Sequence, residues 1–228
     1  MTCRFDLVAF DVDGTLVHHP EDKTVWEVLN HRFTGSDDQN ALRWDLYKQG
    51  KLSYAEWVAL DIESWRGSGA TRDLMTEHFG DLALVAGARE TLQALKSAGV
   101  RLAVISGTLD LLLDTLFPDH PFDEVYTNRI AFDPEGRISH WHATPFDMDG
   151  KGIALRAIAM REDIPLSRTA FVGDHANDIP AAQIAGFSIA FNPKSEELES
   201  LASVVVRSRD LRDILPHLLQ TRAVNSQL

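Results

Sequence analysis

The sequence predicts an α/β protein with a doubly wound parallel sheet and a small helical domain inserted after the first strand. Two observations carry this prediction. From residue 81 onward, short apolar runs typical of buried strands alternate with helical segments, as in a parallel sheet with helices on both faces. Residues 17–80, by contrast, show only helical patterns separated by glycines. We therefore expect a core domain of residues 1–16 and 81–228 and a helical cap domain of residues 17–80.

The expected elements follow from apolar runs and from the glycines and prolines that separate them. Strands are expected at 5–10, 100–105, 123–127, 129–132, 137–140, 169–172, 188–191 and 203–206. Core helices are expected at 88–98, 109–117, 151–161, 177–185 and 211–219, and the first two end at Gly99 and Pro118. The inserted block predicts helices at 21–33, 37–49, 53–65 and 72–79, with no convincing strand. Such alternation gives a Rossmann-like sheet.

Composition excludes several classes of function. The 228 residues are 44% hydrophobic and 25% charged, a globular mixture that argues against disorder. A formal charge of −12 repels nucleic acid and anionic membranes, so neither is an expected partner. Asp6, Asp11 and Asp13 interrupt the apolar start of the chain, so no signal peptide is expected. A single cysteine, Cys3, favours a reducing, cytoplasmic setting.

Three of the expected strands end in polar residues that can do chemistry. DVDGT begins at residue 11 after the first strand, SGT begins at 106 after a second, and GDHAND begins at 173 after a third. Ligands of open parallel sheets bind outside the carboxyl ends of the strands. Because a buried strand gains nothing from such endings, their convergence predicts a functional site at this edge of the sheet.

The first ending suits the transfer of a phosphoryl group. Asp11 and Asp13 are two residues apart and face one side of an extended chain, and a turn at Gly14 lets them aim at different atoms. One carboxylate can attack phosphorus and form an aspartyl-phosphate, while the other protonates the leaving oxygen and then deprotonates water. The simpler alternative is that both only cap a turn. The two further polar endings favour the catalytic interpretation.

The other endings supply groups that bind anions and metals. Ser106 precedes an expected helix start, where N–H groups favour an anion, although ordinary N-capping by Ser106 or Thr108 is the better explanation of this stretch taken alone. Lys151 also stands at an expected helix start and is either solvated or paired with an anion. Asp11 and Asp174, with Asp178 as a further candidate, would gather the hard oxygen ligands that suit Mg²⁺. Such an ion would offset repulsion between this acidic chain and a phosphorylated substrate.

The stretches DVDGTLV, VISGTLD, FVGDHANDIPAAQIAG and the lysine in DGKGIAL together resemble the haloacid dehalogenase-like hydrolase superfamily, and the phosphoserine phosphatase-like branch looks most similar. The resemblance implies that Asp11 is the nucleophile and Asp13 the general acid and base. It also implies that Mg²⁺ is held by Asp11, by the backbone carbonyl of Asp13 and by Asp174. The block at 17–80 is similar to the small helical cap of this branch, which closes over the site, excludes water and contacts the leaving group.

The same resemblance implies roles for the remaining residues. Ser106 and Gly107 would bind the phosphoryl group, and Lys151 would neutralise its charge. Asn177 would also bind the phosphate. Two supporting residues are Thr15 and Asp178, the latter within the network that joins the lysine to the metal.

The sequence also departs from this branch. Gly14 and Thr108 stand where phosphoserine phosphatases typically carry Ser and Gly. Their cap Glu falls at Pro20, with Glu21 one place off, and their cap Arg falls within residues 59–61, which contain no Arg. Because those two cap residues recognise the amino-acid part of phosphoserine, the departures weigh against phosphoserine as the substrate.

We therefore expect a Mg²⁺-dependent phosphatase that hydrolyses a small phosphomonoester metabolite through an aspartyl-phosphate on Asp11. Two alternatives stay open at this point. One is a phosphotransferase or mutase that uses the same phosphoenzyme, and the other is a non-catalytic signalling module phosphorylated at Asp11. Asp13 and the cap argue against the module, since a switch needs neither a leaving-group acid nor a lid.

Overall fold

A seven-stranded sheet organises the molecule. The computed structural model describes residues 2–220, so residue 1 and the last part of the expected core, 221–228, lie outside it. The sheet order is β10-β9-β8-β2-β5-β6-β7. Its strands are β2 (Leu7–Phe10), β5 (Arg101–Leu109), β6 (Glu124–Phe132), β7 (Ile138–His142), β8 (Thr169–Gly173), β9 (Phe187–Phe191) and β10 (Val204–Val206). Every neighbouring pair is parallel except the β6–β7 hairpin, so the predicted α/β class with a parallel sheet is confirmed.

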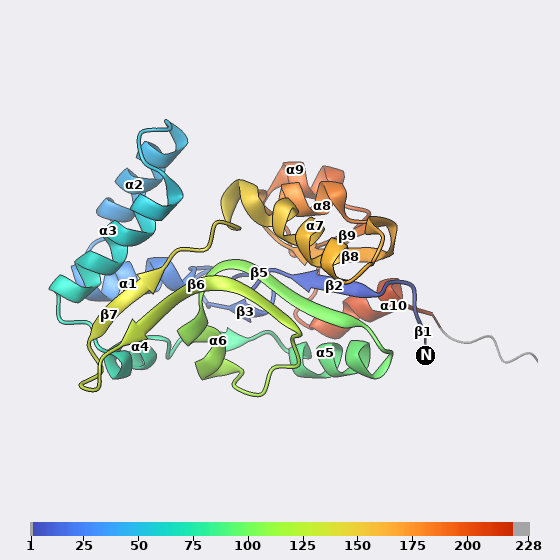
Figure 1. Cartoon of the computed structure of the whole chain (residues 1–228), viewed down its shortest axis with the longest axis horizontal. Helices are drawn as coiled ribbons and strands as arrows, with labels where there is room; N and C mark the ends of the chain where they lie inside the picture. The colour runs from blue at the N-terminus through green and yellow to red at the C-terminus, as the bar shows by residue number, and fades with distance from the viewer. Residues whose placement is uncertain (1, 221–228) are drawn as a thin grey trace, which may run out of the picture.

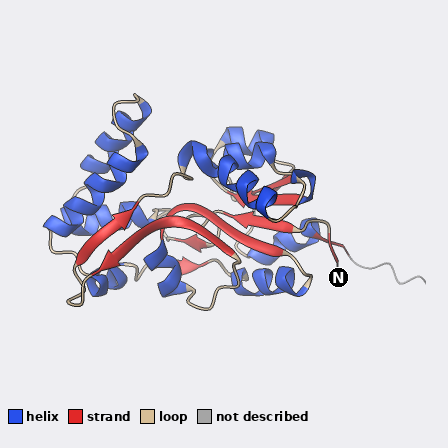
Figure 2. Cartoon of the chain, viewed as in Figure 1, coloured by secondary structure: helices blue, strands red, loops and turns tan. Residues whose placement is uncertain are grey.

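Helices cover both faces of this sheet (Figures 1 and 2). One face carries α7 (Lys151–Arg161), α8 (Ile179–Ile184) and α9 (Glu196–Leu201), and the other carries α5 (Ala88–Ser97), α6 (Asp110–Leu116) and α10 (Leu215–Leu218). The alternation of side chains along a strand explains the two layers. Leu7 and Ala9 of β2 pack in one apolar cluster with α7. Val8 and Phe10 point the other way and join the cluster that contains residues of α5 and α6.

The block between β2 and α5 is mainly helical, as predicted. It consists of α1 (Val25–Thr34), α2 (Asp38–Lys48), α3 (Tyr54–Gly67) and α4 (Arg72–His78). Capping boxes begin two of these helices, Thr24 with Glu27 at α1 and Ser53 with Glu56 at α3. In the view of Figure 1, α2 and α3 stand side by side above the end of the sheet where β6 and β7 lie. The buried apolar residues of α1, α3 and α4 belong to the same cluster as the α5 face of the sheet, so the block packs onto the sheet domain.

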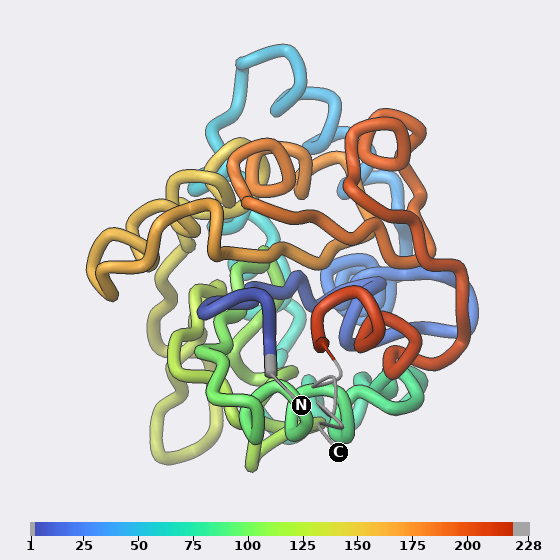
Figure 3. Tube along the Cα trace, turned by 90° about the vertical axis from the view of Figure 1, so that its right-hand side faces the viewer, coloured from blue at the N-terminus to red at the C-terminus, as the bar shows by residue number. Residues whose placement is uncertain are grey.

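Two short strand pairs lie outside the main sheet. β3 (Val17–His18) pairs antiparallel with β4 (Ala83–Leu84), so the helical block begins and ends at neighbouring points. The prediction that residues 17–80 contain no strand was wrong in this detail, because a two-residue strand has no periodicity to detect. β1 (Thr2–Cys3) pairs with β11 (Leu219–Gln220), and Figure 3 shows the start and end of the described chain side by side.

Several boundaries differ from the predictions. Residues 123–127 and 129–132 form one strand, β6, and β5 continues to Leu109 instead of ending at 105. A register shift between Ile105 and Leu109 accommodates this extension. The expected helix at 177–185 begins as a 3₁₀ turn, η3 (Ala176–Asp178), before α8. Within residues 2–220, every helix falls short of the length and apolar character that a bilayer crossing requires.

Candidate active site

The carboxyl ends of β2, β5 and β8 bring the predicted site residues to one edge of the sheet. β2 lies between the other two strands, and Phe10 at its end is paired in register with both. Asp11 follows Phe10 directly, while Ser106 and Asp174 each stand two residues beyond the position paired with Phe10. The strand register alone therefore places these side chains at nearly the same level.

Three buried carboxylates and one buried lysine form the centre of the site. Asp11, Asp174 and Asp178 each offer a carboxylate oxygen, and these oxygens lie within 4.8 Å of one another. Lys151 is fully buried, and its Nζ donates to Asp11 Oδ1 and to Asp178 Oδ1 at 2.7 Å each. Although burial opposes its charge, the carboxylates of Asp11 and Asp178 raise the pKa of Lys151 above its ordinary value. The lysine therefore stays protonated.

The hydrogen bonds of Asp178 suit a supporting position. Its Oδ1 accepts from Lys151, and its Oδ2 accepts from the backbone N–H groups of Asp174 at 2.8 Å and His175 at 3.0 Å. Both oxygens of Asp178 are thus occupied by donors. Asp11 and Asp174 are consequently the better placed carboxylates for a cation.

The donor set fits a divalent metal ion such as Mg²⁺, which prefers oxygen ligands. The buried Lys151 bonds to Asp11 and Asp178, and the Nζ of the partly exposed Lys194 is 3.6 Å from Asp174 Oδ2. Burial, together with the charges of Asp11 and Asp178, raises the pKa of Asp174 well above its ordinary value. A divalent cation would relieve this excess of buried negative charge.

Asp13 contacts the helical block and has a raised pKa. Its Oδ1 accepts from the backbone N–H of Val25 at 3.1 Å, which links the site to the first turn of α1. Burial and the nearby Asp11 carboxylate raise the pKa of Asp13 to about 7. A carboxyl group with a pKa near neutrality can donate a proton in one step and accept one in the next.

The turn after β2 holds Asp174 against the site. Gly14 has a φ of 86°, and a Cβ at this position would collide with the Asp174 carboxylate. The fully buried Thr15 donates from Oγ1 to Asp174 Oδ1 at 3.3 Å. The structure thus brings Thr15, predicted as a supporting residue, into contact with the carboxylate predicted to bind metal.

The predicted phosphate-binding residues of β5 meet Asn177 through an unpredicted carboxylate. Ser106 is buried, and its Oγ accepts from the backbone N–H of Thr108 at 3.2 Å. Asn177 Nδ2 donates to Asp147 Oδ1 at 2.9 Å, and the Asp147 carboxylate lies against Gly107. Ser106 and Thr108 do not cap the next helix, since α6 has no side-chain cap and β5 continues past both residues.

Sequence reasoning missed two buried residues of this region, Asp147 and Asn128. Asp147 lies beside Gly107, and Asn128 Nδ2 donates to the carbonyl oxygen of Gly107 at 2.6 Å. The only sequence signals are positional: Asp147 precedes Lys151 by four residues, and Asn128 follows an expected strand. Neither signal indicates a contact with Gly107.

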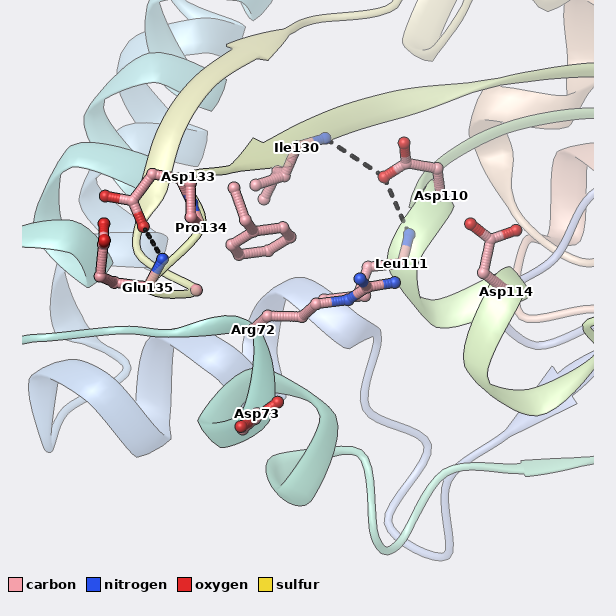
Figure 4. Close-up of a pocket in the computed structure, with 11 residues that line it drawn as sticks. Arg72, Asp73, Asp110, Leu111, Asp114, Ile130, Asp133, Pro134 and Glu135 are labelled. Carbon is pink, nitrogen blue, oxygen red and sulfur yellow. Dashed lines mark hydrogen bonds between the residues drawn. The ribbon is translucent and has the colours of Figure 1, made fainter.

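A hollow in the surface lies among α4, α6 and the β6–β7 turn (Figure 4). Arg72 extends from α4 toward α6 inside it. Its acidic lining residues are Asp73, Asp110, Asp114, Asp133 and Glu135. None of the residues predicted for the active site lines this hollow, so it is separate from the carboxylate cluster.

Known proteins that are similar to this chain belong to the family that its motifs indicate. The model of the haloacid dehalogenase-like hydrolases matches residues 5–186. A phosphoserine phosphatase of Mycobacterium tuberculosis is 33% identical over 82% of this chain, although the chain spans only 44% of that relative. One from Methanocaldococcus jannaschii is 29% identical over 93% of this chain and 97% of its own length.

Solved structures show the same relationship. A phosphoserine phosphatase with an analogue of its phospho-aspartyl intermediate superposes with a TM-score of 0.75 at 27% identity, covering 94% of this chain and 99% of the other. A substrate-bound phosphoserine phosphatase has a TM-score of 0.71, also at 27% identity, and covers 94% of this chain and 99% of the other. The family match over most of the chain, together with the strand-end motifs, shows that the chain belongs to the haloacid dehalogenase-like hydrolases.

Proposed function

We propose that this chain is a Mg²⁺-dependent phosphatase that hydrolyses a small phosphomonoester through an aspartyl-phosphate on Asp11. The observation that carries the proposal is the meeting of Asp11 and Asp174, from two different strands, beside the buried Lys151. The names of the relatives, and the phospho-aspartyl analogue in one of them, support the same reaction class. In this proposal residues 17–80 act as a cap over a core of residues 1–16 and 81–228.

The two half-reactions use the two aspartates of the first motif. In the first, a carboxylate oxygen of Asp11 attacks phosphorus, the ester P–O bond breaks, and the Asp13 carboxyl gives its proton to the departing oxygen. In the second, water attacks the phosphorus of the aspartyl-phosphate, and the Asp13 carboxylate takes the proton of that water. The bond between phosphorus and Asp11 then breaks, which returns both aspartates to their starting states and releases phosphate.

The phosphoryl group is held by residues from three other segments. The Ser106 hydroxyl and the backbone of Gly107 bind its oxygens, with Asn177 beside them. Lys151 neutralises its charge, because the lysine is protonated and reaches Asp11 itself. The supporting residues are Thr15, which bonds to Asp174, and Asp178, which bonds to Lys151.

The carboxylates of Asp11 and Asp174, with the backbone carbonyl of Asp13, would hold Mg²⁺. When bound, the ion keeps Asp11 ionised and neutralises charge on the transferring group. The crowding of buried carboxylates supports this assignment, because the described side chains near them supply less positive charge than negative.

The positions that would recognise the amino-acid part of phosphoserine carry other chemistry in this chain. Glu21, next to Pro20, is exposed and forms an ion pair with Lys23 at 2.8 Å. Asp61 is buried and paired with Arg43. These contacts support a small phosphomonoester other than phosphoserine as the preferred substrate.

The proposed setting follows from composition. The substrate is a small phosphorylated metabolite, since a net charge of −12 disfavours nucleic acid and anionic membranes. The lone Cys3, which is free, supports a reducing, cytoplasmic environment.

The test is phosphate release from 4-nitrophenyl phosphate and from a panel of phosphorylated metabolites that includes phosphoserine. Multiple turnovers that need Mg²⁺ and are lost in Asp11→Asn support the proposal. Transfer to an added alcohol in preference to water would instead identify a phosphotransferase. A long-lived phosphoenzyme without repeated turnover would identify a signalling module.

A further inference from the structure

The carbonyl oxygen of Gly107 receives hydrogen bonds from two side chains that are distant in sequence. Trp26 Nε1, on α1, donates to it at 2.7 Å, and Asn128 Nδ2, on β6, donates to it at 2.6 Å. The same Asn128 nitrogen also donates to the hydroxyl oxygen of Tyr54, on α3, at 2.7 Å. Two residues of the helical block thus contact the predicted phosphate-binding stretch, Trp26 directly and Tyr54 through Asn128.

The orientation of the Asn128 amide is fixed by its other contact. The backbone N–H of Thr144 donates to Asn128 Oδ1 at 2.9 Å, so the oxygen must face that donor. The two N–H bonds of the amide are then directed at Gly107 and Tyr54. Asn128 is fully buried, so its amide is shielded from bulk solvent.

Holding the Gly107 carbonyl also orients the hydroxyl of Ser106. The C=O of Gly107 and the N–H of Thr108 belong to one planar peptide and point in opposite directions. That N–H donates to Ser106 Oγ at 3.2 Å. Because Oγ accepts this bond, its own proton is left to donate, and no acceptor for it is found among residues 2–220. The proton is therefore available to a phosphate oxygen.

The opposite side of Gly107 is held by the sheet domain. The Asp147 carboxylate lies where a Cβ on Gly107 would be, and Asn177 fixes Asp147 through a bond of 2.9 Å. Gly107 is thus enclosed between the carboxylate on one side and the Trp26 and Asn128 donors at its carbonyl. Its backbone has little freedom to turn while all of these contacts are made.

We propose that Trp26 and Tyr54 are positioning residues, through which the helical block sets the Ser106 hydroxyl for phosphate binding. This inference rests on the proposed phosphatase function and deepens it. Because both residues act on Gly107 and not on the leaving group, their loss weakens the binding of the phosphoryl group itself. The effect is therefore the same for substrates with different leaving groups, and it extends to inorganic phosphate.

A pair of matched tryptophan variants tests the proposal. Trp26→Phe keeps an aromatic ring beside Trp65, whose ring centroid is 4.9 Å away, but removes the N–H that reaches Gly107. Trp65→Phe removes the other indole N–H of this ring pair, which donates to Asn30 Oδ1 at 2.8 Å and not to Gly107. The two changes are alike in size and in the number of hydrogen bonds lost.

The measurements are the dissociation constant of inorganic phosphate by calorimetry in Mg²⁺, the thermal midpoint, and kcat and KM for two substrates with different leaving groups. We expect Trp26→Phe to raise the phosphate dissociation constant, and both KM values alike, by about two- to tenfold, the scale of one hydrogen bond. Tyr54→Phe changes them in the same direction. In the double variant Trp26→Phe/Tyr54→Phe, the phosphate dissociation constant should rise by less than the product of the two single increases, because both residues act on the same carbonyl. Trp65→Phe lowers only the thermal midpoint.

The outcomes separate this inference from the proposed function. Equal phosphate affinities in Trp26→Phe and Trp65→Phe overturn the positioning role, even when the wild-type protein is an active phosphatase. If the wild-type protein binds phosphate but turns over no substrate, and Trp26→Phe weakens phosphate binding, the positioning role stands and the proposed function is wrong. Wild-type protein that binds no phosphate overturns both.

Discussion

Two acidic regions of the molecule differ in burial. At the ends of β2 and β8, Asp11, Asp174 and Asp178 are all buried, and the buried Lys151 bonds to the first and the last of them. The hollow of Figure 4 gathers a larger number of carboxylates, but Asp114 and Glu135 among them are exposed. Water and salt screen the exposed charges, whereas buried carboxylates require a cation to remain ionised together. Burial, and not the number of acidic residues, therefore distinguishes the region suited to chemistry.

The largest expected contrast concerns turnover. Asp11→Asn should lower kcat/KM by more than about a thousandfold, because it removes the nucleophile. Asp114→Asn is the matched change in the hollow and should leave kcat/KM within about twofold, as for an ordinary surface substitution. Steady-state phosphate release measures both. An Asp11→Asn protein with a tenth of wild-type activity would contradict the assignment.

Removing a cation should cost the two regions different amounts of stability. Lys151→Met leaves buried carboxylates without their partner and should lower the free energy of unfolding by about 3–5 kcal/mol in metal-free protein. Arg137 lies next to the hollow and pairs with its lining residues Asp133 and Glu135, and because the arginine is exposed, Arg137→Met should cost about 1 kcal/mol or less. Urea unfolding in the presence of a chelator compares the two, and equal losses would remove the distinction drawn from burial.

Mg²⁺ should stabilise the folded protein through the buried region alone. At a hundred times its dissociation constant, a ligand that binds only the folded state adds about 2.7 kcal/mol, which raises the thermal midpoint of a chain this long by roughly 5–10 °C. Asp174→Asn should abolish this shift, and Asp133→Asn, in the hollow, should keep it. Calorimetric scans with and without Mg²⁺ measure the thermal midpoint of each variant. A Mg²⁺-dependent rise that persists in Asp174→Asn would refute the metal assignment.

The smallest predicted effect is a pH dependence. With the pKa of Asp13 raised to about 7, its carboxyl is protonated below that pH and ionised above it. The proton donor for the leaving group is thus lost as the pH rises, and kcat/KM for an alkyl phosphate should fall up to tenfold per unit above pH 7. The decline should be weaker for 4-nitrophenyl phosphate, whose leaving group needs no proton. Asp114→Asn should keep this profile, and Asp13→Asn should lose it.

The meeting of the aspartates at the strand ends could be predicted from sequence, because it depends on simple rules of strand geometry. The spacing of Asp11 and Asp13 needs only the two-residue period of an extended chain, and their meeting with Asp174 needs only the rule on carboxyl ends of parallel strands. The structure places the oxygens of Asp11 and Asp174 within 4.8 Å, as that rule requires.

The surroundings of Gly107 could not be predicted in the same way. Trp26 lies 81 residues away, and its bond to Gly107 depends on how the helical block packs on the sheet. Asp147 and Asn128 reach the same glycine from a loop and a neighbouring strand. No periodicity connects these positions, and the continuation of β5 past residue 105, which shapes the site, depends on a shift in strand register.

The β3–β4 pair bears on how relatives of this protein diversify. Because Val17–His18 lies beside Ala83–Leu84, the intervening segment leaves and rejoins the sheet domain at one place. A segment attached in this way can be lengthened, trimmed or exchanged without altering the order or register of the seven main strands. A transplanted insert is therefore a practical route to new selectivity, provided that it restores the contacts of Trp26 and Tyr54 with Gly107 and Asn128 and that of Val25 with Asp13.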